Sequence, residues 1–191
     1  MNTDALAPSD VLSLVVEPPR GLTAALEPTT VRWLAAADRM ALARLLSVDS
    51  PFDDEDRQVA LELIDAAIGD LSRGALDPTR SGYEVLVATH AGDVVGYICF
   101  GPTPMTLGTY DLYWVATAGE ARGKGVARSL VRAMEAQLRL RSARLVRVET
   151  SRLEAYGAAR AFYSRIGYPI AAELRDFYRP GEDLIVYVKV L

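Results

Sequence analysis

The sequence predicts an α+β protein built on a mixed, mostly antiparallel sheet flanked by helices, and three features of its middle carry this prediction. Residues 83–90 and 93–101 are rich in β-branched and aromatic residues and are separated by Ala91-Gly92, which is the pattern of a β-hairpin. Residues 109–117 have the same character and are expected to add a third strand. The period of the apolar residues then changes to that of an amphipathic helix over 122–141.

Helix signals dominate the segment before the hairpin. Residues 31–36 are expected to form the first core strand, and a helix is expected over 39–46. A longer helix is expected over 51–71, because Leu61, Leu63, Ile64, Ile68 and Leu71 recur at near-helical spacing. Ser50-Pro51 is a favourable start, since the hydroxyl can cap the helix and proline has no N–H to leave unsatisfied. Gly74 is expected to end this helix.

The segments that follow and precede these complete the domain. A strand over 145–150, a helix over about 156–166 and two strands around 179–183 are expected after the amphipathic helix. Residues 1–30 hold several prolines and little periodicity, although 11–17 could pair as a short strand. We therefore predict an N-terminal extension over 1–30 and one folded domain over 31–191.

Composition excludes several classes of protein. At 191 residues, half of them hydrophobic, the chain is long enough for one core and short for two. The net charge of -4 gives no general attraction to nucleic acid. A single cysteine, Cys99, the absence of a secretory leader pattern and the absence of an apolar run of roughly 20 residues favour a cytoplasmic protein with no membrane partner.

The segment from 111 to 127 is the most informative, since a strand runs through a short turn into a helix. The first N–H groups of a helix are unsatisfied and carry a partial positive charge, and Gly123 and Gly125 allow a phosphate to approach the backbone. The turn lacks the Lys-Ser or Lys-Thr of a P-loop and the third glycine of a dinucleotide fingerprint. It predicts a pyrophosphate site of another kind, and an ordinary tight turn is the alternative.

Two motifs resemble those of the GNAT superfamily of N-acyltransferases. Arg122-x-x-Gly125-x-Ala127 matches the family's Gln/Arg-x-x-Gly-x-Gly/Ala motif, and the segment 159–168 is similar to its A-x-x-F-Y-x-x-x-G-F motif. The order of strand, helix and second motif is also that of the family, so the resemblance covers roughly residues 31–191. It implies the GNAT fold and transfer of an acetyl group from acetyl-CoA to an amine.

The resemblance also implies which residues bind the cofactor. Backbone N–H groups of the turn would hold the coenzyme A pyrophosphate beside Arg122, and the strand before it would hold pantetheine at Val115 and Thr117. The turn residues are Gly123, Lys124, Gly125, Val126, Ala127 and Arg128. The chain departs from the family at Thr117-Ala118-Gly119, where Val-x-Pro is usual, and at Tyr156, where asparagine often contacts the cofactor.

Catalytic candidates follow from the same resemblance. Tyr163 occupies the position of the tyrosine that protonates the departing thiolate, although packing of its helix is the alternative. Asp111 lies at the spacing at which one branch of the family places a glutamate base, and a solvated carboxylate is the alternative. Glu149 is the second candidate base because of its place, at the end of the strand beside the cofactor helix, with an ion pair to Arg147 or a loop cap as the alternative.

Clues to the acceptor are weaker. Asp53, Asp54, Glu55 and Asp56 begin the helix that lies over the acceptor groove in this fold, but carboxylates there also complement a helix dipole. Asp176 and Tyr178 are candidates to line the acceptor site. The basic run Arg128, Arg132, Arg139, Arg141, Arg144 and Arg147 is interpreted as a solvated face and a partner for the 3′-phosphate of coenzyme A.

The leading hypothesis is therefore an acetyl-CoA-dependent N-acetyltransferase acting on a primary amine of a small molecule, peptide or protein. An acyl-CoA-binding sensor without turnover is the alternative, suggested by Tyr156 and the altered turn. No metal is expected, and His90 is expected in an exposed loop. The resemblance leaves a homodimer open.

Overall fold

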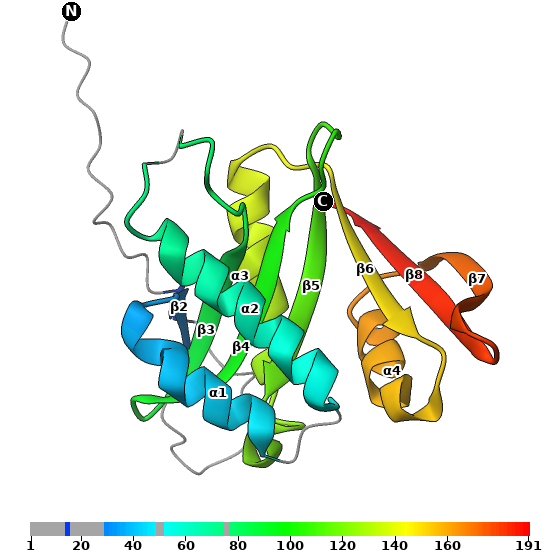
Figure 1. Ribbon diagram of the computed structural model, residues 1–191, viewed down its shortest axis with the longest axis horizontal. Coiled ribbons are helices and arrows are strands. Elements are labelled where there is room, and N and C mark those ends of the chain that lie inside the picture. The colour runs from blue at the N-terminus through cyan, green and yellow to red at the C-terminus, as the bar shows by residue number, and fades with distance from the viewer. Residues whose placement is uncertain (1–13, 16–28, 49–51, 75–76) are drawn as a thin grey trace, which may run out of the picture.

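A mixed sheet with helices on both faces is formed by the residues that the computed structural model describes, 14–15, 29–48, 52–74 and 77–191 (Figure 1). Its strands lie in the order β1-β2-β3-β4-β5-β6-β8-β7. Every neighbouring pair is antiparallel except β5 and β6, which are parallel. The strands are β1 (Leu14–Val15), β2 (Thr30–Trp33), β3 (Glu84–His90), β4 (Asp93–Pro102), β5 (Thr109–Thr117), β6 (Leu145–Ser151), β7 (Ile170–Arg179) and β8 (Glu182–Val190). The predicted fold class is confirmed.

In the described part of the chain, four helices cover the sheet, and short 3-10 turns precede or connect several of them. The helices are α1 (Arg39–Ser47), α2 (Asp54–Asp70), α3 (Val126–Leu140) and α4 (Gly157–Arg165), and the 3-10 turns are Ala36–Asp38, Gly119–Ala121 and Glu154–Tyr156. In Figure 1, α1 and α2 lie in front of β3, β4 and β5, and α3 lies behind them. Each face therefore has its own core.

The two cores divide the apolar side chains of the strands by alternation. Leu86, Ile98 and Leu112 pack with α3, whereas Val87 and Cys99 pack with α1 and α2. Because successive strand residues face opposite sides, one strand supplies both cores. The long apolar runs of β3 and β4 are explained by this burial on both faces.

Several predicted boundaries need correction. The first core strand ends at Trp33 instead of residue 36, because a 3-10 turn begins at Ala36. Helix α2 begins at Asp54, with Asp53 as its cap accepting the Asp56 N–H at 2.8 Å, and it ends at Asp70, before Gly74. The predicted Ser50-Pro51 start lies outside the described residues.

Two further predictions concern the turn ahead of α3 and the only histidine. Helix α3 begins at Val126 instead of residue 122, because Gly123 and Gly125 adopt positive φ values of 74° and 85° that end any regular helix there. His90 is the last residue of β3 and pairs with Asp93, so the prediction that it lies in a loop was wrong.

Strands β5 and β6 pair over only part of their lengths, and this feature positions the site. The parallel ladder runs from Thr109 and Leu145 to Leu112 and Val148. Beyond it, β5 continues on β4 as far as Thr117, and β6 continues on β8 as far as Ser151. The two strands diverge there, and α4 lies near the open end (Figure 1). We call this opening the fork.

The predicted N-terminal extension lies mostly outside the described residues. Leu14 and Val15 pair with Val31 and Thr30 at the edge of the sheet, within the predicted strand 11–17. The division into an extension over 1–30 and a domain over 31–191 stays a prediction. Among the residues that the structure describes, no helix has the length and apolar character needed to cross a membrane.

Candidate functional site

A cavity of about 480 Å³ lies where β5 runs into α3, across from α4. Backbone from the turn and the first residues of α3 forms one wall, and the end of α4 forms the other. The lining residues are Thr117, Ala121, Arg122, Gly123, Gly125, Val126, Ala127, Arg128, Phe162, Arg165 and Ile166. The cavity therefore joins the first predicted motif to the second.

The turn presents free helical N–H groups to this cavity. The first hydrogen bond of α3 runs from the Ser129 N–H to the Gly125 carbonyl at 3.0 Å. The N–H groups of Val126, Ala127 and Arg128 precede it and so have no carbonyl of their own helix to bind. Together with the partial positive charge of a helix start, they make this end of the cavity suited to an anion.

Guanidinium groups strengthen this electrostatic preference. Arg122, Arg128 and Arg165 line the cavity, and none of the described residues that line it is acidic. A phosphate-bearing ligand would meet both oriented N–H groups and positive charge. Of the predicted basic run, only Arg128 reaches the cavity, whereas Arg139, Arg141 and Arg147 form ion pairs with Glu135, Glu84 and Asp111.

Most of the predicted cofactor-binding residues meet here, and three do not line the cavity. The Lys124 N–H donates to the Ala121 carbonyl at 3.3 Å, so it is engaged within the turn. Val115 packs against the core on the α3 side, in the unpaired part of β5. The Tyr156 hydroxyl donates to the Asp56 carboxylate at 3.2 Å, which links the start of α4 to the start of α2. Burial, and then Asp56, raise the pKa of Tyr156 to about 12.

Tyr163 lies in the core, and its neighbour in sequence, Phe162, lines the cavity. Its ring contacts Phe162, Tyr168 and Tyr187 at centroid distances of 5.3, 6.0 and 5.6 Å. Burial, and then Tyr187, raise the pKa of its hydroxyl above the ordinary value, so the hydroxyl stays protonated through neutral pH. Packing is therefore one role of this side chain, and protonation is the state that a general acid requires.

The two candidate bases share one arginine. Asp111 is only 6% exposed, and its Oδ1 accepts a hydrogen bond from Arg147 Nε at 2.7 Å. The alternative interpretation of Asp111 as a solvated carboxylate is wrong, because the side chain is buried. Its role as a base stays a prediction. Glu149 Oε1 lies 3.3 Å from Arg147 Nη1 and its side chain is 40% exposed. Asp111 belongs to the paired part of the ladder, whereas Glu149 lies in the fork.

The residues predicted to line the acceptor site differ in the contacts that they make. Asp53 and Asp56 cap α2 reciprocally, so the acidic helix start has a structural role. Asp176 adopts a left-handed φ of 51° and its carboxylate accepts the Gly181 N–H at 2.6 Å, so it builds the β7–β8 turn. Tyr178 is half-exposed, and burial, followed by Glu149 and Glu182, raises its pKa.

Sequence reasoning missed one wall of the cavity. Phe162, Arg165 and Ile166 belong to the second motif, but only their tertiary position shows that they line the cavity. The positive charge of Arg165 near the end of α4 was the one available signal. Among the described residues, no group of three or more metal-ligating side chains lies together.

Known proteins resemble this chain in sequence and in fold. The model of the acetyltransferase (GNAT) domain matches residues 81–170. A crystal structure assigned to the GNAT acetyltransferases, from Desulfovibrio desulfuricans, is 37% identical and has a TM-score of 0.77 over 85% of this chain and 98% of its own. No curated protein matches the sequence significantly.

More distant structures share the fold. The ribosomal-protein-S18-alanine N-acetyltransferase from Escherichia coli is 17% identical, with a TM-score of 0.62 over 85% of this chain and 93% of its own. An aminoglycoside 6′-N-acetyltransferase complexed with coenzyme A is 15% identical, with a TM-score of 0.63 over 84% of this chain and 96% of its own.

Proposed function

The chain belongs to the GNAT family of acetyltransferases, and from this premise we propose that it transfers an acetyl group from acetyl-CoA to a primary amine. The observation that carries the proposal is the anion-binding turn at the end of the fork, with three arginines and a helix start around one cavity. These residues fit the pyrophosphate and 3′-phosphate of coenzyme A. The pantetheine arm would extend into the fork along the unpaired part of β5.

In the proposed reaction the neutral amine attacks the thioester carbonyl directly. A C–N bond forms, the C–S bond breaks, the amine loses a proton and the thiolate gains one. A lysine-like amine has a pKa near 10.4, so deprotonating it at pH 7 requires about 4.6 kcal/mol. A base near the fork would lower this barrier, and close positioning of amine and carbonyl would supply much of the remaining rate.

We assign the base role to Glu149 in preference to Asp111. Glu149 is exposed in the fork, where an amine must approach, and it can act directly or through one water. Asp111 is buried against Arg147 and is proposed to hold that arginine in place. Tyr163 is proposed to donate a hydrogen bond to the departing thiolate, for which its protonated hydroxyl is suited.

The acceptor is proposed to carry a positive charge. Several carboxylates lie on elements near the fork: the acidic start of α2, Glu149 and Glu182. Some of these carboxylates contribute to raising the pKa of Tyr156 and the pKa of Tyr178. The related structures named for ribosomal-protein alanine and aminoglycosides suggest peptide N-termini and aminoglycosides as probes. Both are cationic at neutral pH.

Release of free thiol from acetyl-CoA in the presence of each acceptor tests the proposal. Acceptor-dependent release, with an acetylated product of the expected mass, is the predicted result. One observation favours a second candidate, an acyl-CoA sensor: the Tyr156 hydroxyl donates its hydrogen bond to Asp56, so this donor is already used within the protein. Cofactor binding without thiol release from any peptide, polyamine or aminoglycoside would favour the sensor.

A further inference from the structure

A second cavity, of about 390 Å³, lies where β2 ends and β3 begins, between the last turns of α2 and α3. The phosphate-binding turn is at the other end of α3, a helix of 15 residues, so roughly 20 Å separates the two cavities. The proposed acetyl transfer uses none of its residues. The volume is within the range of about 300–1,000 Å³ that is typical of small-molecule sites.

One wall of this cavity is apolar and incompletely covered. Leu34 and Val85 are buried, whereas Leu71 is 55% exposed and Trp33 is 38% exposed. Tyr83, half-buried, also lines it. A large indole and a leucine open to the same hollow leave apolar surface that a bound hydrocarbon group would remove from water.

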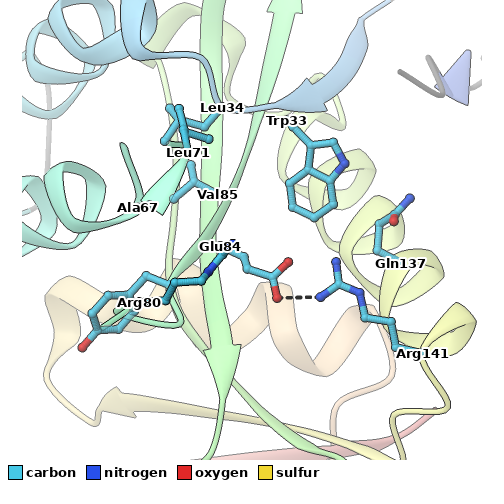
Figure 2. A pocket seen from close by; sticks show the side chains of 10 residues that line it. Trp33, Leu34, Ala67, Leu71, Arg80, Glu84, Val85, Gln137 and Arg141 are labelled. Carbon is cyan, nitrogen blue, oxygen red and sulfur yellow. Dashed lines mark hydrogen bonds and ion pairs between the residues drawn. The ribbon is translucent and has the colours of Figure 1, made fainter. Parts of the chain in front are cut away.

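An ion pair between Glu84 and Arg141 also lines the cavity. Glu84 Oε1 lies 2.6 Å from Arg141 Nη1, and the Arg141 guanidinium lies over the Trp33 ring at 5.7 Å from its centroid. Figure 2 shows this pair as a dashed line, with Gln137 on the same side as Trp33. Arg141 is therefore neutralised and held by Glu84.

A second guanidinium, that of Arg80, has no carboxylate partner among the residues that the structure describes. Arg80 lines the cavity and donates one long hydrogen bond, at 3.4 Å, to the Arg73 carbonyl. No ion pair joins Arg80 to any residue in the part of the chain that the structure describes, while Arg73 pairs with Asp70 at 2.7 Å. Two guanidinium groups and one carboxylate thus give the lining one excess positive charge.

We propose that this cavity binds a small carboxylate with an aromatic or branched apolar body. The ligand carboxylate pairs with Arg80, and the apolar body lies against Trp33 and Leu71. An acid with a free α-amino group and one without it share this chemistry. The former would add an ammonium contact to Glu84, so the experiment includes both.

Intrinsic fluorescence tests the proposal, because the chain has two tryptophans and Trp33 lines the cavity. The full chain is titrated with phenylacetate, with phenylalanine and with benzyl alcohol, which has the ring but no charge. We expect a saturable change with one of the acids that is lost in Trp33→Phe. Arg80→Gln should weaken binding at least about tenfold, because it removes a charge-assisted hydrogen bond. Arg44→Gln, on the exposed side of α1, is the matched control and should bind as the parent does.

The outcomes separate cleanly. Tighter binding of phenylalanine than of phenylacetate, reversed by Glu84→Gln, supports the proposal and narrows the ligand to an amino acid; the opposite order narrows it to a simple acid. The proposal is overturned if neither acid gives a saturable change, if benzyl alcohol binds as tightly, or if Arg80→Gln binds as the parent does. None of these results depends on whether the chain transfers acetyl groups.

Discussion

The paired and open parts of the β5–β6 junction differ in what takes up the space between the strands. In the paired part, Leu112, Val146 and Val148 enter the core beneath α3, and Asp111 and Arg147 form a cross-strand ion pair. In the open part, β5 pairs only with β4 and β6 pairs only with β8. The turn ahead of α3 borders a cavity there, which three arginines line. The sheet is thus continuous where β5 and β6 pair, and it leaves room for a ligand where they diverge.

The comparison predicts that the open part governs catalysis and the paired part governs stability. The first test is Gly125→Val. A β-branched residue disfavours the φ of 85° by about 1–2 kcal/mol. Relaxing this φ would misdirect two N–H groups, each of which contributes roughly 2 kcal/mol to binding a phosphate. We expect kcat/KM for acetyl-CoA to fall about 10³-fold.

The matched control for this change is Gly92→Val, in the β3–β4 hairpin. Gly92 has a φ of 90°, and neither glycine has an atom within 4 Å of an added Cβ, so both changes impose similar backbone strain. The control should lower thermal stability without changing KM for acetyl-CoA. Equal kinetic losses in both variants would contradict a special role for the phosphate-binding turn.

The second test is Tyr163→Phe, which removes the hydroxyl and keeps the ring contacts. We expect kcat to fall about 10²-fold to 10³-fold, with the Kd of coenzyme A unchanged. Tyr168→Phe is the control, because its hydroxyl binds Glu135 at 3.0 Å in the core and should affect stability by about 1–3 kcal/mol, not turnover.

The pH profile sharpens this second test. The pKa of Tyr163 is raised by burial, so its protonated form persists beyond the ordinary tyrosine pKa of about 10. Wild-type kcat should therefore show no alkaline loss from Tyr163 below about pH 10. The same shift makes its contribution to folding stability complete below about pH 10 and lost as the pH rises further. If kcat instead falls near pH 8 and Tyr163→Phe abolishes that fall, the raised pKa of Tyr163 is contradicted.

The third test contrasts the two carboxylates across the junction. Glu149→Gln should lower kcat/KM for the amine about 10²-fold at pH 7, with partial recovery at higher pH as more amine is neutral. Asp111→Asn should mainly lower the free energy of unfolding, by about 1–3 kcal/mol, because Arg147 loses its buried partner. Steady-state rates and denaturant unfolding of both variants show which carboxylate serves catalysis and which serves stability. The reverse pattern would transfer the base role to Asp111.

The smallest effect is expected for Tyr156→Phe. The change removes the hydrogen bond to Asp56 and should lower the free energy of unfolding by about 1 kcal/mol. The Kd of coenzyme A, measured by calorimetry, should change less than about twofold. A tenfold weakening would instead support the cofactor contact expected for this position from the family motif.

Local patterns in the sequence were sufficient for most of the fold. Strand β5 and the hairpin formed by β3 and β4 were predicted almost residue for residue, because β-branched runs and a turn dipeptide are local signals. The start of α2 was misplaced, since Asp53 competes with Ser50 as a cap and the choice depends on the docked helix. The start of α3 was misplaced because positive φ at Gly123 and Gly125 is set by the completed turn.

The sequence by itself determined the family, the glycine turn ahead of α3 and the order of elements, because these depend on short motifs and on periodicity along the chain. Only the tertiary structure decided that Arg165 faces the turn, that Asp111 is buried beneath Arg147, and that Tyr156 is joined to Asp56. It also placed Trp33 and Arg80 at one cavity. These contacts join residues far apart in the chain, so their geometry follows from packing and strand order, which no local pattern encodes.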